Sequence, residues 1–132
     1  MLRLRRDVYL RMIGDCFDGL PNEACGLIAG RGSDGHVAYP ITNVAASSRI
    51  YELDPKQHLR ADRDAEDRGL EIIGVYHSHT HTVGYPSPTD VQQAPDPGWH
   101  YILVSLADEA PTVRSYRIVD GNITEEPVVV AN

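Results

Sequence analysis

The sequence has only two cysteines and no hydrophobic run that approaches the roughly 20 residues needed to cross a bilayer as a helix. The scarcity of cysteine excludes a small domain held together by several disulfides, and the lack of a long hydrophobic run predicts no membrane-spanning helix. Residues 1–7 also lack the hydrophobic stretch of a signal peptide. We therefore expect a cytoplasmic protein in which Cys16 and Cys25 are free thiols.

Basic side chains are also scarce, because 12 lysines and arginines stand against 19 aspartates and glutamates, for a net charge of −7. Nucleic-acid binding draws much of its affinity from basic side chains that neutralise phosphates, so this balance disfavours a nucleic-acid-binding protein. The one basic cluster consists of Arg3, Arg5, Arg6 and Arg11. We interpret it as the solvated face of a helix.

What the sequence does contain is an ordinary globular composition, 42% hydrophobic and 23% charged. A chain of 132 residues with this composition is long enough to build one domain around a hydrophobic core. No repeat, low-complexity tract or linker divides it. We expect residues 1–132 to form a single domain.

Two helices are predicted in the first half of the chain. Apolar residues recur over 9–20 at i, i+3, i+4, i+7, i+8 and i+11, which is typical of a helix that buries one stripe. A second helix is expected over 55–69, because Asp54 followed by Pro55 is typical of an N-cap and a first helical position. Gln57 is placed to complete a capping box with Asp54.

Strands are predicted where short apolar runs are bounded by turn residues, at 24–29, 37–44, 72–76, 101–106, 115–119 and from Ile123 onward. The runs at 72–76 and 101–106 are continuously apolar, as expected for inner strands of a sheet that is covered on both faces. Asp120-Gly-Asn122 predicts a hairpin turn. Together these elements predict an α/β (α+β) fold in which helices pack a mixed β-sheet.

The most informative segment follows the strand at 72–76 and begins with His77 and His79. Two residues apart on a strand, these side chains project from the same side with Cα atoms about 6.5 Å apart. Both imidazoles can therefore converge on one cation. The pair alone does not distinguish metal ligands from solvated or structural histidines.

Ser87 and Pro88 are typical of the N-cap and first position of a short helix, which places Asp90 in its first turn. In the simpler interpretation, Ser87 and Asp90 form a capping box. In the other, the chain folds Asp90 back beside the imidazoles as a third metal ligand, and one carboxylate can serve both purposes. Two histidines and a carboxylate, with a fourth position left to water, are the ligands of a hydrolytic zinc site.

A water on such a zinc ion needs a partner that takes its proton and delivers it to the leaving amine, which suits a glutamate. Our candidate is Glu23, which lies where the first helix gives way to a buried strand. A charge there is costly unless it faces a cleft. From its position alone, a solvated loop residue is the simpler interpretation.

His81 extends the run to three alternating histidines, which allows a three-histidine site on one strand face. The chain must already turn toward Gly84 and Pro86 at this point. We therefore expect His81 to be a loop histidine near the substrate groove.

The series Glu23, His77-x-His79, seven residues, Ser87, two residues and Asp90 resembles the motif of the JAMM, or MPN-plus, zinc metallopeptidases. The resemblance covers nearly the whole chain, through Glu-Ala-Cys-Gly-Leu at 23–27, Tyr-His-Ser-His-Thr at 76–80, Tyr-Pro-Ser at 85–87 and Arg-Ser-Tyr-Arg-Ile-Val-Asp-Gly at 114–121. It implies a single MPN-like domain with one Zn²⁺ bound by His77, His79 and Asp90. It also implies Glu23 as general base and acid, and Ser87 as a donor to the developing oxyanion.

Within this family, the sequence is most similar to peptidases that release cysteine from the C-terminus of a small ubiquitin-like sulfur-carrier protein. The resemblance implies cleavage after the carrier's C-terminal glycine, and we expect the carrier tail to bind as an added strand at the sheet edge beside the metal. Two alternatives stay open: processing or deconjugation of another ubiquitin-like protein, and a non-catalytic interaction module in which zinc braces a loop. The oligomeric state is open as well, with a homodimer among the alternatives.

Overall fold

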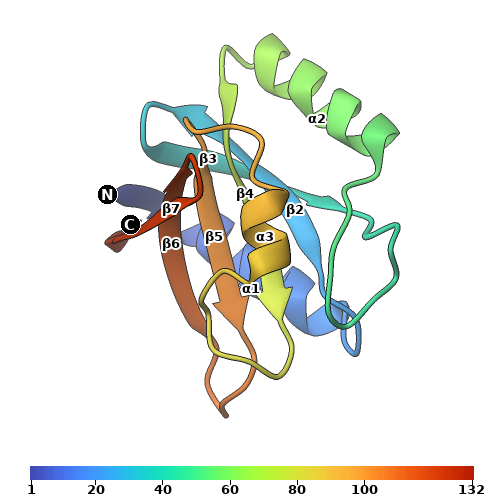
Figure 1. The fold of residues 1–132 in the computed structure, drawn as a ribbon. Coiled ribbons are helices and arrows are strands. Elements are labelled where there is room, and N and C mark those ends of the chain that lie inside the picture. Colours follow the sequence, from blue (N-terminus) through green and yellow to red (C-terminus); the bar gives the residue numbers. More distant parts are fainter.

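The computed structural model describes residues 1–132 and confirms the predicted mixed sheet packed by helices. Its eight strands follow the order β7-β6-β5-β4-β2-β3-β1-β8, and α1 and α3 lie on opposite sides of the sheet (Figure 1). None of the helices combines the length and hydropathy that crossing a membrane requires. The elements are β1 (Leu2–Arg5), α1 (Arg6–Asp18), β2 (Cys25–Arg31), β3 (Asp34–Ile41), α2 (Pro55–Asp67), β4 (Glu71–His79), α3 (Pro88–Gln92), β5 (His100–Ser105), β6 (Thr112–Val119), β7 (Asn122–Glu126) and β8 (Val128–Ala131).

The core has two layers, as expected for a sheet that is covered on both faces. On one face, Val8, Met12 and Cys16 of α1 pack into a buried cluster with side chains of the sheet. On the other, Ala61 of α2 and Val75 of β4 belong to a second buried cluster. Cys16 and Cys25 fall in different layers as free thiols, which confirms that prediction.

The first helix lies earlier than its periodicity predicts, since α1 spans Arg6–Asp18 rather than 9–20. Val8 is buried at its start, whereas Phe17 and Leu20, both assigned to the buried stripe, are exposed. The helix is capped by Gly19, whose backbone N–H donates to the carbonyl of Asp15, and the N–H of Leu20 donates to the carbonyl of Phe17. Its last turn therefore does not extend the stripe of buried side chains.

The basic cluster near the N-terminus is not the face of one helix, which corrects our interpretation. Leu2 and Leu4 are fully buried and alternate with exposed Arg3 and Arg5, which is the period of a strand. This strand, β1, pairs in parallel with both β3 and β8. The sequence hides it because four residues of strand run directly into α1.

The hairpin at Asp120-Gly121 is confirmed, with both residues at positive φ (51° and 78°) between β6 and β7. The strand expected from Ile123 onward is divided at Pro127, beyond which β8 pairs with β1 at the opposite end of the strand order. The carbonyl of Pro127 accepts a hydrogen bond from the backbone N–H of Leu2 (2.9 Å). Pro127 thus links the two edge strands of the sheet.

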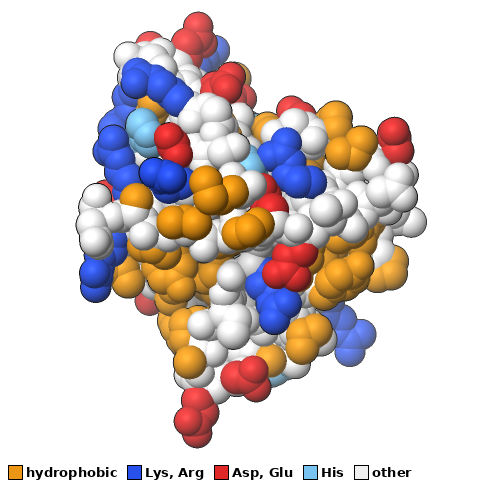
Figure 2. All heavy atoms as spheres, turned by 90° about the vertical axis from the view of Figure 1, so that its left-hand side faces the viewer, with side chains coloured by type: hydrophobic (Ala, Val, Ile, Leu, Met, Phe, Trp, Pro, Cys, Tyr) orange, Lys and Arg blue, Asp and Glu red, His pale blue; other side chains and the backbone are white.

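The face of the molecule that carries both chain ends is shown in Figure 2, where hydrophobic side chains gather over its middle.

The second helix is capped by Asp54, whose side chain accepts hydrogen bonds from the backbone N–H groups of Lys56 (2.9 Å) and Gln57 (3.2 Å). Gln57 does not complete a capping box, which corrects that expectation. Its amide instead bonds both the backbone N–H (2.7 Å) and the hydroxyl (2.9 Å) of Thr42. Gln57 therefore ties the start of α2 to the segment that follows β3.

Replacing the cap tests how much α2 contributes to stability. Asp54→Ala leaves two helix N–H groups without their acceptor, so we expect the free energy of unfolding to fall by about 1 kcal/mol. Urea denaturation measures the difference. Asp67→Ala, at an exposed position near the end of the same helix, is the matched control and should cost much less. Equal losses for the two variants would contradict the capping role.

Candidate metal centre

The two histidines at the end of β4 lie in the middle of the sheet. His77 pairs with Cys25 of β2 on one side and with Leu103 of β5 on the other, and His79 pairs with Ser105. β4 is therefore paired with strands on both sides at His77, and on the β5 side at His79. The expected addition of the carrier tail as a strand beside the metal stays a prediction.

The short helix α3 brings Asp90 to these histidines through the predicted capping box. Asp90 Oδ2 accepts the backbone N–H of Ser87 (2.9 Å), and Ser87 Oγ accepts the backbone N–H of Asp90 (3.1 Å). The same Oδ2 lies 3.0 Å from His79 Nε2 and 3.2 Å from His77 Nε2. The cap and the cluster thus coexist, and one oxygen takes part in both.

The spacing of these atoms fits a zinc ion. His77 Nε2 and His79 Nε2 are 3.3 Å apart, and one ligand atom from each of His77, His79 and Asp90 lies within 4.8 Å of the others. A tetrahedral site with bonds of about 2.0–2.1 Å places its ligand atoms about 3.3–3.4 Å apart. All three side chains are buried, and together they can hold one metal ion.

Neighbouring groups orient both imidazoles. His79 Nδ1 lies 2.9 Å from the carbonyl of Val83, to which it donates, so that Nε2 keeps its lone pair for the cluster. The ring of Tyr51 stacks on that of His77, with centroids 4.3 Å apart. No sequence signal pointed to Tyr51 or to Val83, because both contacts arise from folding and not from spacing.

Burial and hydrogen bonding set the protonation of the cluster. Burial lowers the pKa of His77 and works to lower that of His79, but the hydrogen bonds of His79 to Asp90 and to the Val83 carbonyl raise its pKa. Burial works to raise the pKa of Asp90, and the hydrogen bonds from both imidazoles outweigh it and lower that pKa. Asp90 is thus ionised, which is the state in which a carboxylate can bind a metal ion.

Glu23 is buried, with 4% of its surface exposed, so the solvated-loop interpretation is wrong. Its backbone N–H donates to the carbonyl of Ser47 (2.8 Å), and its own carbonyl accepts from Asn43 Nδ2 (2.9 Å). The side-chain Oε1, in contrast, has no hydrogen-bond partner. Burial raises the pKa of Glu23 to about 7. A buried carboxyl without a partner is costly, and this one is positioned for chemistry.

A polar cavity of about 460 Å³ joins this carboxyl to the metal cluster. Glu23, His79 and Ser87 line it together with loop residues 48–49 and 80–82, and no hydrophobic side chain contributes. His81 is exposed in the wall of this cavity and lies outside the metal cluster, so the expected loop position is confirmed.

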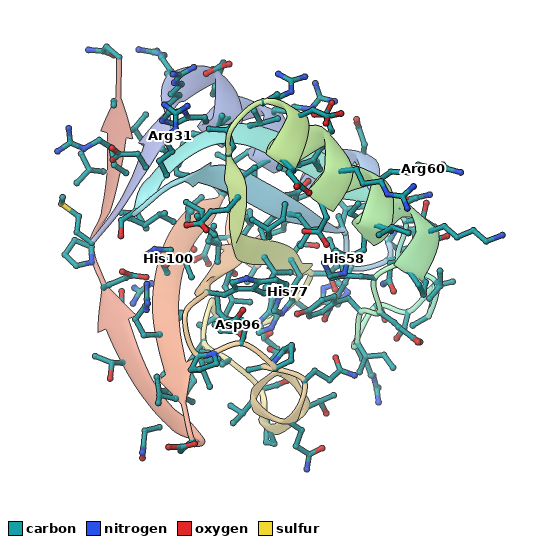
Figure 3. The ribbon with its side chains drawn as sticks, turned by 90° about the horizontal axis from the view of Figure 1, so that it is seen from above. Arg31, His58, Arg60, His77, Asp96 and His100 are labelled. Atoms are coloured by element: carbon teal, nitrogen blue, oxygen red, sulfur yellow. The ribbon has the colours of Figure 1, made fainter.

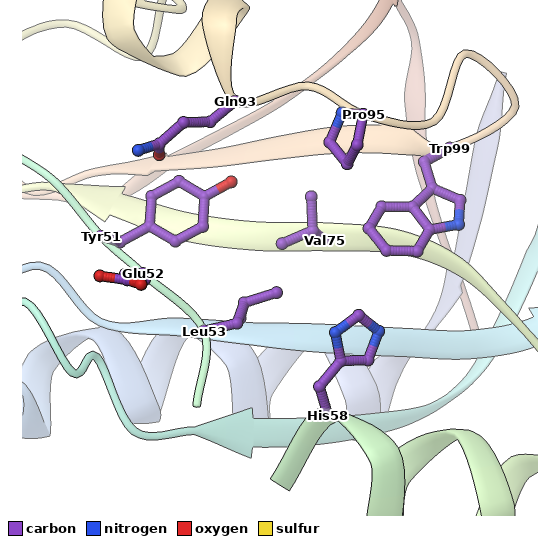
Figure 4. Close-up of a pocket in the computed structure, with 8 residues that line it drawn as sticks. All are labelled: Tyr51, Glu52, Leu53, His58, Val75, Gln93, Pro95 and Trp99. Carbon is purple, nitrogen blue, oxygen red and sulfur yellow. The ribbon is translucent and has the colours of Figure 1, made fainter. Parts of the chain in front are cut away.

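The Tyr51 ring also lines an apolar pocket of about 370 Å³ (Figure 4). Val75 and Leu53 contribute to it, and the rings of His58 and Trp99 lie at one end, with centroids 6.0 Å apart and planes tilted by 53°. The pocket was not predicted from the sequence, because its walls come from four separate segments. Since Tyr51 both lines this pocket and stacks on His77, the pocket adjoins the metal cluster.

A second buried histidine, His100, belongs to a different network. Its Nδ1 lies 2.6 Å from Glu126 Oε2, which also accepts from Ser115 Oγ (2.8 Å). Figure 3 shows His77 near the middle of the molecule and His100 toward the side of β6 and β7. His77, His79 and Asp90 form the one cluster of three or more side chains placed to hold a metal.

Comparison with known proteins defines the class to which this fold and site belong. Residues 5–119 match the sequence family described as prokaryotic homologs of the JAB domain. The chain therefore belongs to the JAB, or JAMM/MPN, family, and it is a JAMM-type peptidase with a single JAB/MPN-like domain.

Individual relatives are similar over most of the chain. The CysO-cysteine peptidase of Mycobacterium tuberculosis is 44% identical over 98% of this chain and 91% of its own length. The desampylase of Haloferax volcanii is 40% identical over 64% of this chain and 63% of its own.

Solved structures share the fold. A Desulfitobacterium hafniense protein has a TM-score of 0.91 at 33% identity, covering 99% of this chain and 93% of its own. A structure described as a JAMM metalloprotease-like zinc site in the proteasome and signalosome has a TM-score of 0.65 at 16% identity, covering 100% of this chain and 99% of its own. The second likeness concerns the fold alone.

The raised pKa of Glu23 predicts a pH-dependent effect of Glu23→Gln on stability. Because ionisation of Glu23 is less favourable in the folded protein, the wild type loses stability as the pH rises from the ordinary glutamate range through about 7. Replacement by glutamine removes this loss. The gain in free energy of unfolding of the variant over the wild type should therefore be roughly 1–3 kcal/mol larger at pH 8 than at pH 5.

Urea denaturation of the metal-free protein at the two pH values measures that difference. Glu71→Gln, at an exposed position at the start of β4, is the control and should show no such pH dependence. A gain for Glu23→Gln that is the same at both pH values would show that Glu23 ionises normally.

Proposed function

We propose that residues 1–132 form one zinc-dependent peptidase domain that cleaves after the C-terminal glycine of a small ubiquitin-like sulfur-carrier protein and releases cysteine. The observation that carries this proposal is the convergence of His77, His79 and Asp90 beside a cavity into which the unpartnered carboxyl of Glu23 opens. Hydrolytic zinc sites have three protein ligands and keep the fourth position for water or substrate, which matches the three candidate ligands here.

His77, His79 and Asp90 would hold the zinc ion, which when bound polarises a carbonyl group and lowers the pKa of water. Glu23 acts as general base and then as general acid, taking a proton from the attacking water and passing it to the leaving amine. A pKa of about 7 suits both tasks near neutral pH, because the carboxyl can gain and lose a proton at little cost.

Ser87 supplies a hydrogen bond to the carbonyl oxygen as that oxygen becomes negative. Its Oγ already accepts the backbone N–H of Asp90, which fixes the hydroxyl and leaves its own hydrogen free to donate. A donor that is held in place before the reaction stabilises charge that exists only in the transition state. Ser87 lines the same cavity as Glu23.

Two relatives support the class of substrate. One is named for a CysO–cysteine conjugate and is similar over nearly the whole chain, which favours cysteine as the leaving group. The other is named a desampylase, which favours removal of a ubiquitin-like protein from its conjugates as a second candidate function. The non-catalytic, zinc-braced module is a third candidate, and it assigns Glu23 no task.

Two substitutions separate the roles of the metal cluster and the general base. Glu23→Gln should keep zinc bound while turnover falls by about 10²–10⁴-fold, because the proton carrier is lost and the ligands are not. His77→Ala should lose zinc and turnover together. Zinc content by elemental analysis and the rate of release of the carrier's C-terminal residue are measured on the same preparations.

Glu71→Gln is again the control, and it should retain both zinc and activity. A fully active Glu23→Gln protein would favour the interaction module. Full activity without zinc would instead remove the metal from the reaction.

The identity of the leaving group is tested with three substrates built on one carrier protein. One ends in a single cysteine after the C-terminal glycine, one carries a longer C-terminal extension, and one is joined through its C-terminus to a lysine side chain. We expect the cysteine-bearing carrier to be cleaved with the highest kcat/KM. Cleavage of the lysine conjugate alone would instead identify a deconjugating peptidase.

A further inference from the structure

We propose that Arg49 binds the free α-carboxylate of the released amino acid and thereby selects C-terminal amino acids over amides and lysine isopeptides. The proposal rests on the proposed function, because it assumes that Glu23 serves the leaving amine. It names a specificity residue that no sequence motif indicated. Its basis is the position of Arg49 in the wall of the cavity that Glu23, His79 and Ser87 also line, which we call the leaving-group pocket.

The position of Glu23 decides which cavity receives the leaving group. The nitrogen that accepts a proton from Glu23 must lie on the Glu23 side of the metal cluster. Glu23 lines the leaving-group pocket, where His79 and Ser87 are also found. It also lines a second cavity, which contains none of the three candidate metal ligands. The apolar pocket at Tyr51 lacks Glu23, so it lies on the side of the carrier tail.

Arg49 is an uncommitted cation in this pocket. Its guanidinium forms no hydrogen bond and no ion pair within the protein, unlike the guanidinium groups of Arg68 and Arg114, which pair with carboxylates. Among the residues that line the pocket, Arg49 alone carries a fixed positive charge. Its guanidinium is therefore available to pair with a negatively charged leaving group.

The backbone next to Arg49 is hydrogen-bonded to the residue that follows β4. Ser47 Oγ accepts the backbone N–H groups of Arg49 (3.0 Å) and Ile50 (3.3 Å), which shapes the turn. The carbonyl of Ser48 accepts a hydrogen bond from Thr80 Oγ1 (3.4 Å). Because Thr80 follows the metal ligand His79, this bond fixes the base of the Arg49 side chain relative to the cluster.

The chemistry of the leaving group explains why a cation matters here. In a C-terminal amino acid, the carbon next to the scissile nitrogen bears a carboxylate, whose oxygens lie about 3 Å from that nitrogen. In a lysine isopeptide, the scissile nitrogen is attached to a methylene chain instead. A guanidinium can bind a carboxylate through two parallel hydrogen bonds, and it has no such partner in an amide or an isopeptide.

Binding measurements test the proposal without depending on turnover. The probe is the CysO–cysteine conjugate for which the mycobacterial relative is named, prepared as the free acid and as the C-terminal amide. Calorimetry uses the zinc-loaded Glu23→Gln protein, which we expect to bind without cleaving. We expect the acid to bind about tenfold more tightly than the amide, a value between those of an exposed and a desolvated ion pair.

Combining Arg49→Ala with Glu23→Gln should remove this preference, because only the affinity for the free acid falls. Arg49→Lys should keep part of the preference, because the positive charge remains while the two parallel hydrogen bonds of a guanidinium are lost. Raising the salt concentration should weaken the preference. Arg63→Ala, which alters an exposed and unpaired arginine on α2, is the matched control and should leave the preference unchanged.

Two results would overturn the role of Arg49: equal affinity for acid and amide before Arg49 is changed, or an equal loss for both after Arg49→Ala. Failure of the proposed function gives a different result. If wild-type protein cleaves neither probe while the Arg49-dependent preference persists, the peptidase proposal is wrong and the carboxylate site is supported.

Discussion

The site depends on one buried carboxylate oxygen that two imidazoles share. Asp90 Oδ2 lies 3.0 Å and 3.2 Å from the two Nε2 atoms while it also accepts the backbone N–H of Ser87. A helix of only five residues, α3, has to place this oxygen against the end of a central strand. The reciprocal cap between Ser87 and Asp90 fixes the first turn of α3, so local helix capping and the metal geometry are the same set of contacts.

The fold divides the surroundings of this site by polarity. On one side, the leaving-group pocket is lined by no hydrophobic residue and contains the unpartnered carboxyl of Glu23. On the other, the Tyr51 ring separates His77 from an apolar pocket that Val75 and Trp99 help to line. An asymmetric substrate, with a protein tail on one side of the scissile bond and a small charged residue on the other, suits this division.

Local sequence patterns mispredict the structure where tertiary pairing overrides them. Residues 2–5 are too few to show a strand on their own, and they form β1 only because β3 and β8 flank them. Phe17 continues the helical period of α1 but has no sheet to pack against. Pro127 interrupts an apolar run, and the chain uses this break to pass from one edge of the strand order to the other.

The short-range features of this protein follow from neighbouring residues and can be predicted from their order in the chain. They are the i, i+2 spacing of His77 and His79, the Ser87–Asp90 cap and the turn at Gly121. Folding alone makes β4 a central strand, buries Glu23 without a partner and brings Arg49 into the same cavity. These depend on contacts between segments far apart in the chain, whose approach no local spacing specifies.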